Sequence, residues 1–217
     1  MLDTLQLLIR PTIETFYMVI GSTIFSLILG FPLGVVLCVT SPDGLMPKNT
    51  LNQLLGRIVN VLRSFPFIIL MILVFPLSRF IVGTSIGTTA TIVPLSVAAA
   101  PFVARIIESA LKEVDPGAIQ AARAMGSTNR QIICKVMIPE AMPALIAGLT
   151  LTVISIIGYS AMAGAIGGGG LGDLAIRYGY QRFRTDVMVG SVLVILVIVE
   201  LVQVFGTKIA NDMINKR

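Results

Sequence analysis

Few residues in this chain have types and spacing that could do chemistry, and they exclude most enzymatic mechanisms. The 217 residues include no histidine, so the commonest metal ligand and general base are missing. The run from Gly167 to Gly172 has the spacing G-x-G-x-x-G, but no strand precedes it, and Asp173 stands where a phosphate-binding loop has lysine. The sequence therefore predicts no catalytic residue, no metal site, and no bound nucleotide or other cofactor.

The polar segment 115–139 is the best candidate for a binding site. Asp115 followed by Pro116 is a typical helix start, because aspartate caps the helix and proline lacks a donor that would be unpaired there. Apolar residues then recur at i, i+3, i+4 and i+7, which predicts a narrow stripe able to enter a groove closely. The stripe consists of Ala118, Ala121, Ala122 and Met125.

A second short helix is expected after a glycine elbow. Gly126 is expected to stop the first helix in a left-handed conformation. Thr128 and Gln131 have the spacing of a capping box, and the second helix is expected to end at Pro139. Periodicity alone favours a different interpretation, an amphipathic linker lying on the bilayer surface.

Composition defines the class of protein. With 55% hydrophobic and 12% charged residues and a mean hydropathy of +0.93, the chain is predicted to be a single-domain, all-α integral membrane protein over residues 1–217. The net charge of +5 does not indicate nucleic-acid binding, since no basic patch is interleaved with aromatic residues. Cys38 and Cys134 are too isolated to imply a disulfide framework.

A bilayer core needs about 20 apolar residues per helix, and on that measure we expect five spans within a core of about residues 13–207. The polar segment then connects the third span, rich in small residues and expected inside the bundle, to the fourth. The first apolar run lacks a basic lead and a cleavage site, so we expect it to be retained. The expected spans are 16–39, 58–80, 87–107, 141–165 and 187–207.

Arg63 and Pro66 stand at the start of the second expected span. A charge and a proline so close to the apolar region are costly unless they face protein or water. Arg63 could extend to the interface, or it could line a polar pathway through the membrane. The residues leave both interpretations of Arg63 open. Glu200, near the inner end of the last span, is expected to be paired with neighbouring groups or to reach water.

Lysine and arginine placement predicts the orientation. Ten basic residues fall on the side of the polar segment against five on the other, Arg63 being left aside, which places that segment and the C-terminus in the cytoplasm and the N-terminus outside. The first group is Lys48, Arg57, Arg105, Lys112, Arg123, Arg130, Lys135, Lys208, Lys216 and Arg217. The second group is Arg10, Arg79, Arg177, Arg182 and Arg184.

The spacing of the polar segment resembles the signature loop of the permease subunits of ABC importers. That loop reads Glu-Ala-Ala, three residues, glycine, nine residues, then Ile-x-Leu-Pro. Here it stands as Gln120-Ala121-Ala122, Gly126 and Val136-Met137-Ile138-Pro139, with Gln120 in place of glutamate. The resemblance implies a coupling helix that seats in a cytoplasmic ATPase. The residues it assigns to that contact are Gln120, Ala121, Ala122, Met125, Gly126 and Pro139.

Nearly the whole chain, including 63–70, 81–87, 121–126 and 158–162, resembles the five-span permease of bacterial methionine importers. The resemblance implies a multi-pass protein of the bacterial inner membrane that passes L- and D-methionine, works as two copies with two ATPase subunits, and receives substrate from an extracytoplasmic binding protein. Its candidates for pathway or gate are Arg63, Pro66, Tyr159, Ser160 and Met162.

Two other functions compete with this one. An ion-gradient-driven secondary transporter or channel for a small polar solute would be expected to show internal repeats or acids and histidines at the membrane midplane. We find no repeat, and Glu200 is the one plausible acid within a span. A purely structural membrane subunit would leave the amphipathic segment 115–139 without a purpose.

Overall fold

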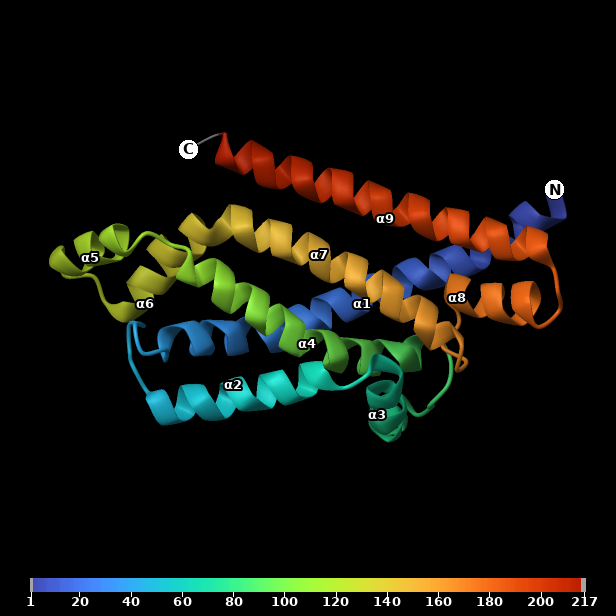
Figure 1. The fold of residues 1–217 in the computed structure, drawn as a ribbon, viewed down its shortest axis with the longest axis horizontal. Coiled ribbons are helices and arrows are strands. Elements are labelled where there is room, and N and C mark those ends of the chain that lie inside the picture. The colour runs from blue at the N-terminus through green and yellow to red at the C-terminus, as the bar shows by residue number, and fades with distance from the viewer. Residues whose placement is uncertain (1, 216–217) are drawn as a thin grey trace.

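The computed structural model describes residues 2–215, and its regular elements are all helical. Met1, Lys216 and Arg217 lie outside the described residues, so the last two basic residues of the orientation argument have no structural account. Figure 1 shows the long helices side by side, with the polar segment at one end and residue 2 at the other. The elements are α1 (Leu2–Val39), α2 (Asn49–Ser64), α3 (Phe67–Val82), α4 (Thr88–Lys112), α5 (Pro116–Ala124), α6 (Asn129–Ile132), η1 (Ile133–Met137), α7 (Ile138–Gly164), α8 (Gly170–Leu174), η2 (Ala175–Tyr180) and α9 (Thr185–Ile214).

Helix α4 is the centre of the bundle. Among the described residues four helical stretches are long and apolar enough to cross a membrane, and the one in α4 has 67% of its most apolar window buried. Helix α1 lies close to α4 because it presents glycine to it. A Cβ on Gly30 of α1 would lie 2.7 Å from the Ala100 carbonyl oxygen of α4. The expected place of the third span inside the bundle is confirmed.

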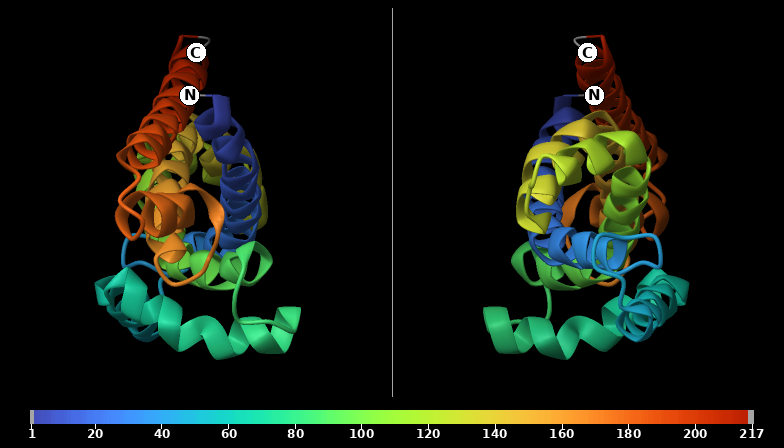
Figure 2. Two further views of the ribbon diagram at one scale, coloured as in Figure 1. Left: turned by 90° about the vertical axis from the view of Figure 1, so that its right-hand side faces the viewer. Right: turned by 90° about the vertical axis from the view of Figure 1, so that its left-hand side faces the viewer.

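The segment expected as one span at 58–80 is two helices in the structure. Helices α2 and α3 meet at Phe65 and Pro66 with a bend of 107°. Proline has no N–H to continue the α2 hydrogen bonds and disfavours a helical residue before it, which explains why the helix breaks here. In Figure 2 this bent pair stands at the edge of the bundle, with α3 turned across the direction of the other helices. Taken together, the pair could make a fifth span.

Helix α1 begins at Leu2, well before residue 16, where the first span was expected. The extra turns have a structural role at the end of the molecule opposite the polar segment. The Glu14 carboxylate accepts the Gly170 N–H at 3.1 Å, and the Thr15 hydroxyl accepts the Leu171 N–H at 2.9 Å. Side chains of α1 thus cap the first N–H groups of α8. These contacts involve Glu14 and Thr15, which precede the apolar run that was expected to form the first span.

The glycine-rich run is a tightly packed turn, not a ligand loop. A Cβ on Gly164 would lie 2.2 Å from the Asp173 nitrogen, and one on Gly172 would lie 2.2 Å from the Ala161 carbonyl oxygen. Asp173 is buried and accepts a hydrogen bond from Arg177, which raises the pKa of that guanidinium. Helices α8 and η2, which the sequence did not predict, continue from this turn.

A buried charge cluster connects α2 to the C-terminal half of α4. The nearly buried Glu108 accepts hydrogen bonds from Arg105 at 2.6 Å and from Lys112 at 2.7 Å. Arg105 also donates to the Gly56 carbonyl at 3.0 Å and to the Asn60 side chain at 2.9 Å. Each charge has a partner of opposite sign, as burial in a low-dielectric interior requires.

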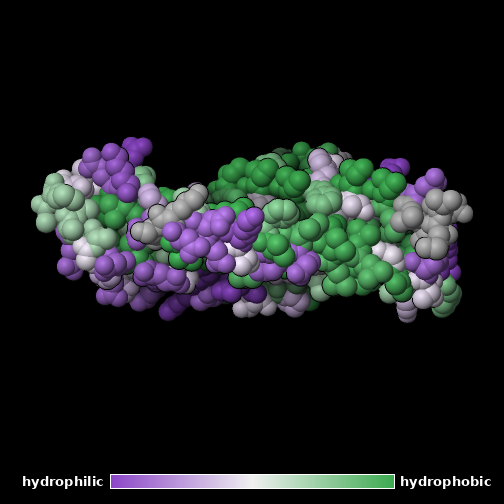
Figure 3. Space-filling model, turned by 90° about the horizontal axis from the view of Figure 1, so that it is seen from above, coloured by the Kyte–Doolittle hydropathy of each residue, from purple (hydrophilic) through white to green (hydrophobic). Residues whose placement is uncertain are grey.

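The surface pattern fits a protein that crosses a membrane several times. Seen over α9 in Figure 3, the middle of the molecule is largely hydrophobic and both ends carry hydrophilic residues. The described chain starts and finishes at opposite ends, and the polar segment shares its end with the last turn of α9 (Figure 1). These are the features of a multi-pass membrane protein.

Candidate functional site

The caps predicted for the polar segment are present. Asp115 accepts a hydrogen bond from the Gly117 N–H at 2.8 Å, with Pro116 in the first helical position of α5. Thr128 and Gln131 form the reciprocal capping box at the start of α6. Side chains of the segment itself therefore cap the first N–H groups of both helices. These N-termini need no hydrogen-bond partner from the rest of the bundle.

Gly126 forms the predicted elbow between α5 and α6. Its φ is +81°, its N–H donates to the Arg123 carbonyl at 2.9 Å, and the Ser127 N–H donates to the Ala122 carbonyl at 3.1 Å. These two bonds close the end of the helix as a left-handed cap. A Cβ at this position would meet nothing within 4 Å, so the elbow is open to the surroundings.

The inner face of α5 is seated on the bundle, which corrects the predicted stripe. Ala122 is 3% exposed and lies in a cluster with Leu45, Ile132 and Met137, while Ile119 packs beside it. Arg123 strengthens this contact by donating to the Leu45 carbonyl at 3.2 Å. Ala122 was expected to enter a partner's groove, but packing against the bundle covers it, because helical periodicity shows a face without showing what that face contacts.

The outer face of α5 is one residue out of phase with the predicted stripe. It presents Gln120, Ala121, Ala124 and Met125, all exposed, and Met125 is 80% exposed. These positions recur at i, i+1, i+4 and i+5, so they form one ridge ending at the Gly126 elbow. A ridge of small residues closed by an exposed methionine is shaped to enter a groove.

Pro139 does not end the second helix, as it was expected to. Helix α6, η1 and α7 run on without a break from Asn129 to Gly164. In η1 the hydrogen bonds skip one residue more than in an α-helix, and the Ile138 N–H donates to the Ile133 carbonyl. This wider turn makes room for the proline ring next to it, so the helix continues.

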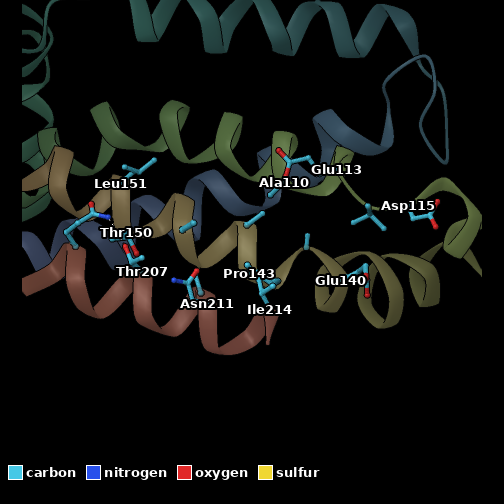
Figure 4. A pocket seen from close by; sticks show the side chains of 16 residues that line it. Ala110, Glu113, Asp115, Glu140, Pro143, Thr150, Leu151, Thr207, Asn211 and Ile214 are labelled. Carbon is cyan, nitrogen blue, oxygen red and sulfur yellow. Dashed lines mark hydrogen bonds between the residues drawn. The ribbon is translucent and has the colours of Figure 1, made fainter. Parts of the chain in front are cut away.

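A cavity of about 620 Å³ lies beside the segment, between α4, α7 and α9. Figure 4 shows Thr207 and Asn211 of α9 on one wall, with Glu113, Asp115 and Glu140 toward the polar segment. The cavity separates the last turns of α9 from α4. Since α5 packs on α6, η1 and the turn at Leu45 instead, its position does not depend on α9.

The structure brings three of the five pathway candidates together at the α2–α3 break. Arg63 lies over the ring of Phe102, with 5.8 Å between Cζ and the ring centroid. The rings of Tyr159 and Phe67 stack at 4.5 Å, and Pro66 is the N-cap residue immediately before α3. Arg63, the two stacked rings and Phe102 line a cavity of about 220 Å³.

The other two candidates lie apart from this cavity. Ser160 follows Tyr159 about 100° around α7, where it is buried and donates to the Ile157 carbonyl of its own helix at 2.8 Å. Met162 is 48% exposed, one turn beyond Tyr159 on the same face. Phe67 and Phe102 were missed as site residues, because their contacts with Tyr159 and Arg63 cross between helices and leave no local pattern in the sequence.

Helical bundle, polar segment and broken helix together define a membrane permease, and comparisons with known proteins specify which kind. The family model described as "Binding-protein-dependent transport system inner membrane component" matches residues 30–217. The chain belongs to this family of transport-system permeases.

Its relatives are similar over almost their full length. A "Probable D-methionine transport system permease protein MetI" of Vibrio cholerae is 49% identical over 201 residues, 93% of this chain and 89% of the relative. The "Methionine import system permease protein MetP" of Bacillus subtilis is 46% identical over 208 residues, covering 96% and 93%. A solved structure of the MetNI methionine ABC transporter in inward-facing conformations matches with a TM-score of 0.95 and 44% identity, covering 97% of this chain and 98% of its own.

Proposed function

We propose that this chain is the permease subunit of an ATP-driven importer that carries methionine, in L and D forms, across the bacterial cytoplasmic membrane. The relatives named for methionine transport support the substrate, and the family supports import over transport driven by an ion gradient. The sequence has no G-x-x-x-x-G-K-[ST] motif, so ATP is hydrolysed by a separate subunit.

The exposed ridge of α5 carries this proposal. Gln120, Ala121, Ala124 and Met125 stand clear of the bundle, while Ala122 and Arg123 hold the same helix against it. The ridge is the coupling helix, which enters a cleft of the ATPase. A neutral glutamine at position 120 makes this contact by shape and hydrogen bonding, without an ion pair.

The transporter contains two copies of the chain with two ATPases, and an extracytoplasmic protein delivers the substrate. A single copy leaves the bent pair of α2 and α3 at the edge of its bundle, and a second copy about a two-fold axis completes the pathway there. When the ATPases close on ATP, they carry both α5 helices together and rock the bundles between inward-open and outward-open states.

Reconstitution tests the function directly. The chain and its ATPase partner, purified together and placed in proteoliposomes with a methionine-binding protein, are expected to take up L- and D-methionine only with ATP. Uptake driven by a proton or sodium gradient without ATP would overturn the importer proposal. Absence of an ATPase from the purified complex would overturn the role of α5.

Orientation can be tested with the two native cysteines. Cys134 is exposed within the polar segment, and Cys38 is buried, so a thiol reagent reports on Cys134 alone. An impermeant maleimide is expected to label inside-out vesicles and to leave intact spheroplasts unlabelled. The Cys134→Ser variant is the control, since it removes the signal in both preparations. Labelling of intact spheroplasts would reverse the orientation.

A further inference from the structure

The cavity at the α2–α3 break has the components of an amino-acid site. We propose that it binds the transported amino acid, with the carboxylate on the Arg63 guanidinium and an unbranched apolar side chain against Phe67, Phe102 and Tyr159. The inference rests on the proposed function, because it states where the permease itself holds its substrate. Each copy of the chain then has its own site at the edge of the pathway.

The charge of Arg63 is the first argument. Arg63 lies in the last turn of α2, and its guanidinium is exposed. It forms no ion pair with any Asp or Glu in the described part of the chain. The guanidinium lies over the aromatic ring of Phe102. An unpaired cation at membrane depth is costly, and the planar guanidinium fits a carboxylate through two parallel hydrogen bonds.

The break itself supplies further polar groups. Helix α2 ends at Ser64 and α3 begins at Phe67, with no side chain capping the start of α3. Helix ends leave carbonyl acceptors on the α2 side and N–H donors on the α3 side without helical partners. A zwitterion needs both kinds, acceptors for its ammonium group and donors for its carboxylate.

The remaining walls suit an apolar, unbranched side chain. Besides Phe67, Phe102 and Tyr159, the cavity is lined by Leu62, Leu70 and Ala98. Its volume of about 220 Å³ equals roughly seven waters at about 30 Å³ each, which is room for one small amino acid. A thioether makes favourable contacts with aromatic rings, so methionine fits these walls better than a polar amino acid does.

Photo-crosslinking tests the site in the complete transporter. The complex with its ATPase, in nanodiscs, is irradiated with photo-methionine, the analogue that carries a diazirine in its side chain, and adducts are mapped by mass spectrometry. We expect adducts on the peptides containing Phe65, Phe67, Phe102 or Tyr159. The Arg63→Gln variant is expected to reduce them at least tenfold. The control Arg79→Gln, an exposed arginine of α3 outside the cavity, is expected to leave them unchanged.

Competition defines which part of the substrate each wall holds. Excess methionine should suppress the labelling, whereas 3-(methylthio)propylamine, which lacks the carboxylate, should not. Tyr159→Phe keeps the stacked ring and should keep the labelling, while Tyr159→Leu should lose it. Equal labelling of the wild type and Arg63→Gln, or adducts confined to other peptides, would overturn the site.

The two proposals fail separately. ATP-dependent methionine uptake by a wild-type complex with an unlabelled cavity would overturn the site and leave the importer standing. Labelling of the cavity in a complex that transports no methionine would overturn the importer and leave the binding site standing.

Discussion

Gly126 lies at the turn between α5 and α6, and Gly172 lies in the short helix α8, just after the turn that follows α7. Glycine is needed for different reasons in the two places. At Gly126 the backbone requires it, since φ is +81° and a Cβ would touch nothing. At Gly172 the neighbours require it, since a Cβ would lie 2.2 Å from the Ala161 carbonyl oxygen. The turn at Gly126 leaves a surface exposed, whereas the backbone at Gly172 is closely packed against α7.

This difference separates binding from support. The elbow at Gly126 satisfies its backbone locally, so its surface can be covered by a partner without any change in the bundle. The turn before α8 uses its polar groups within the chain, where Glu14 and Thr15 of α1 cap the start of α8. Substitutions at the two ends should therefore act on different measurements.

The largest effect is expected from Gly172→Val in α8. The new side chain meets backbone atoms of Ala161 that cannot turn away, so we expect a loss of at least about 3 kcal/mol of stability and poor membrane expression. Gly158→Ala is the matched control, because a Cβ there meets nothing within 4 Å and alanine favours the helix. Thermal unfolding in detergent gives the comparison, and a Gly172→Val protein as stable as wild type would contradict this close packing.

Aspartate at two adjacent alanines of α5 should affect stability at one position only. Ala122→Asp buries an unpaired charge that would cost about 3–5 kcal/mol, a cost limited by α5 detaching from the bundle, so stability and ATPase binding should both fall. Ala121→Asp lies on the exposed ridge and should weaken ATPase binding alone. Thermal unfolding of the permease alone, beside copurified ATPase, separates the two. Equal melting of the two variants would show that Ala122 is not seated as described.

Gly126→Val should uncouple the transporter while leaving its bundle intact. A β-branched residue in the left-handed region costs about 1–2 kcal/mol and adds bulk to the elbow. We expect weaker ATPase binding and hydrolysis without transport in proteoliposomes, with melting changed little. Gly126→Asn, which tolerates this backbone conformation, should keep most of the activity. Normal transport by the valine variant would reduce the segment to a surface linker.

The smallest effect is expected from Thr128→Ala, which removes the cap of α6. Loss of such a cap typically costs about 1 kcal/mol. Hydrogen exchange at Gln131, whose N–H the Thr128 hydroxyl accepts, should become faster while exchange in α4 stays unchanged. Ser127→Ala is the control, because no hydrogen bond of the Ser127 side chain is present among the described residues. An unchanged rate at Gln131 would mean that the capping box does not stabilise the segment.

Local chemistry could be predicted from the sequence, and contacts between distant elements could not. Asp115, Gly126 and the Thr128–Gln131 pair were predicted because each acts on its own neighbours along the chain. Ala122 was expected on the exposed stripe, but its packing near Leu45 buries it in the bundle. Pro139 was expected to end a helix, but the π turn before it lets the helix continue. The same limit hid the cavity, since Phe67 and Phe102 reach Tyr159 and Arg63 from other helices.

The π turn at Ile133–Met137 sets the direction in which the ridge points. A helix turns about 100° per residue, so the extra residue in this turn rotates everything before it by that angle about the axis of α7. Removing one residue here would keep the caps, the elbow and the helices, yet would swing Met125 about a quarter turn away. The π turn therefore determines the direction in which the ridge of α5 faces, in addition to the shape of the segment.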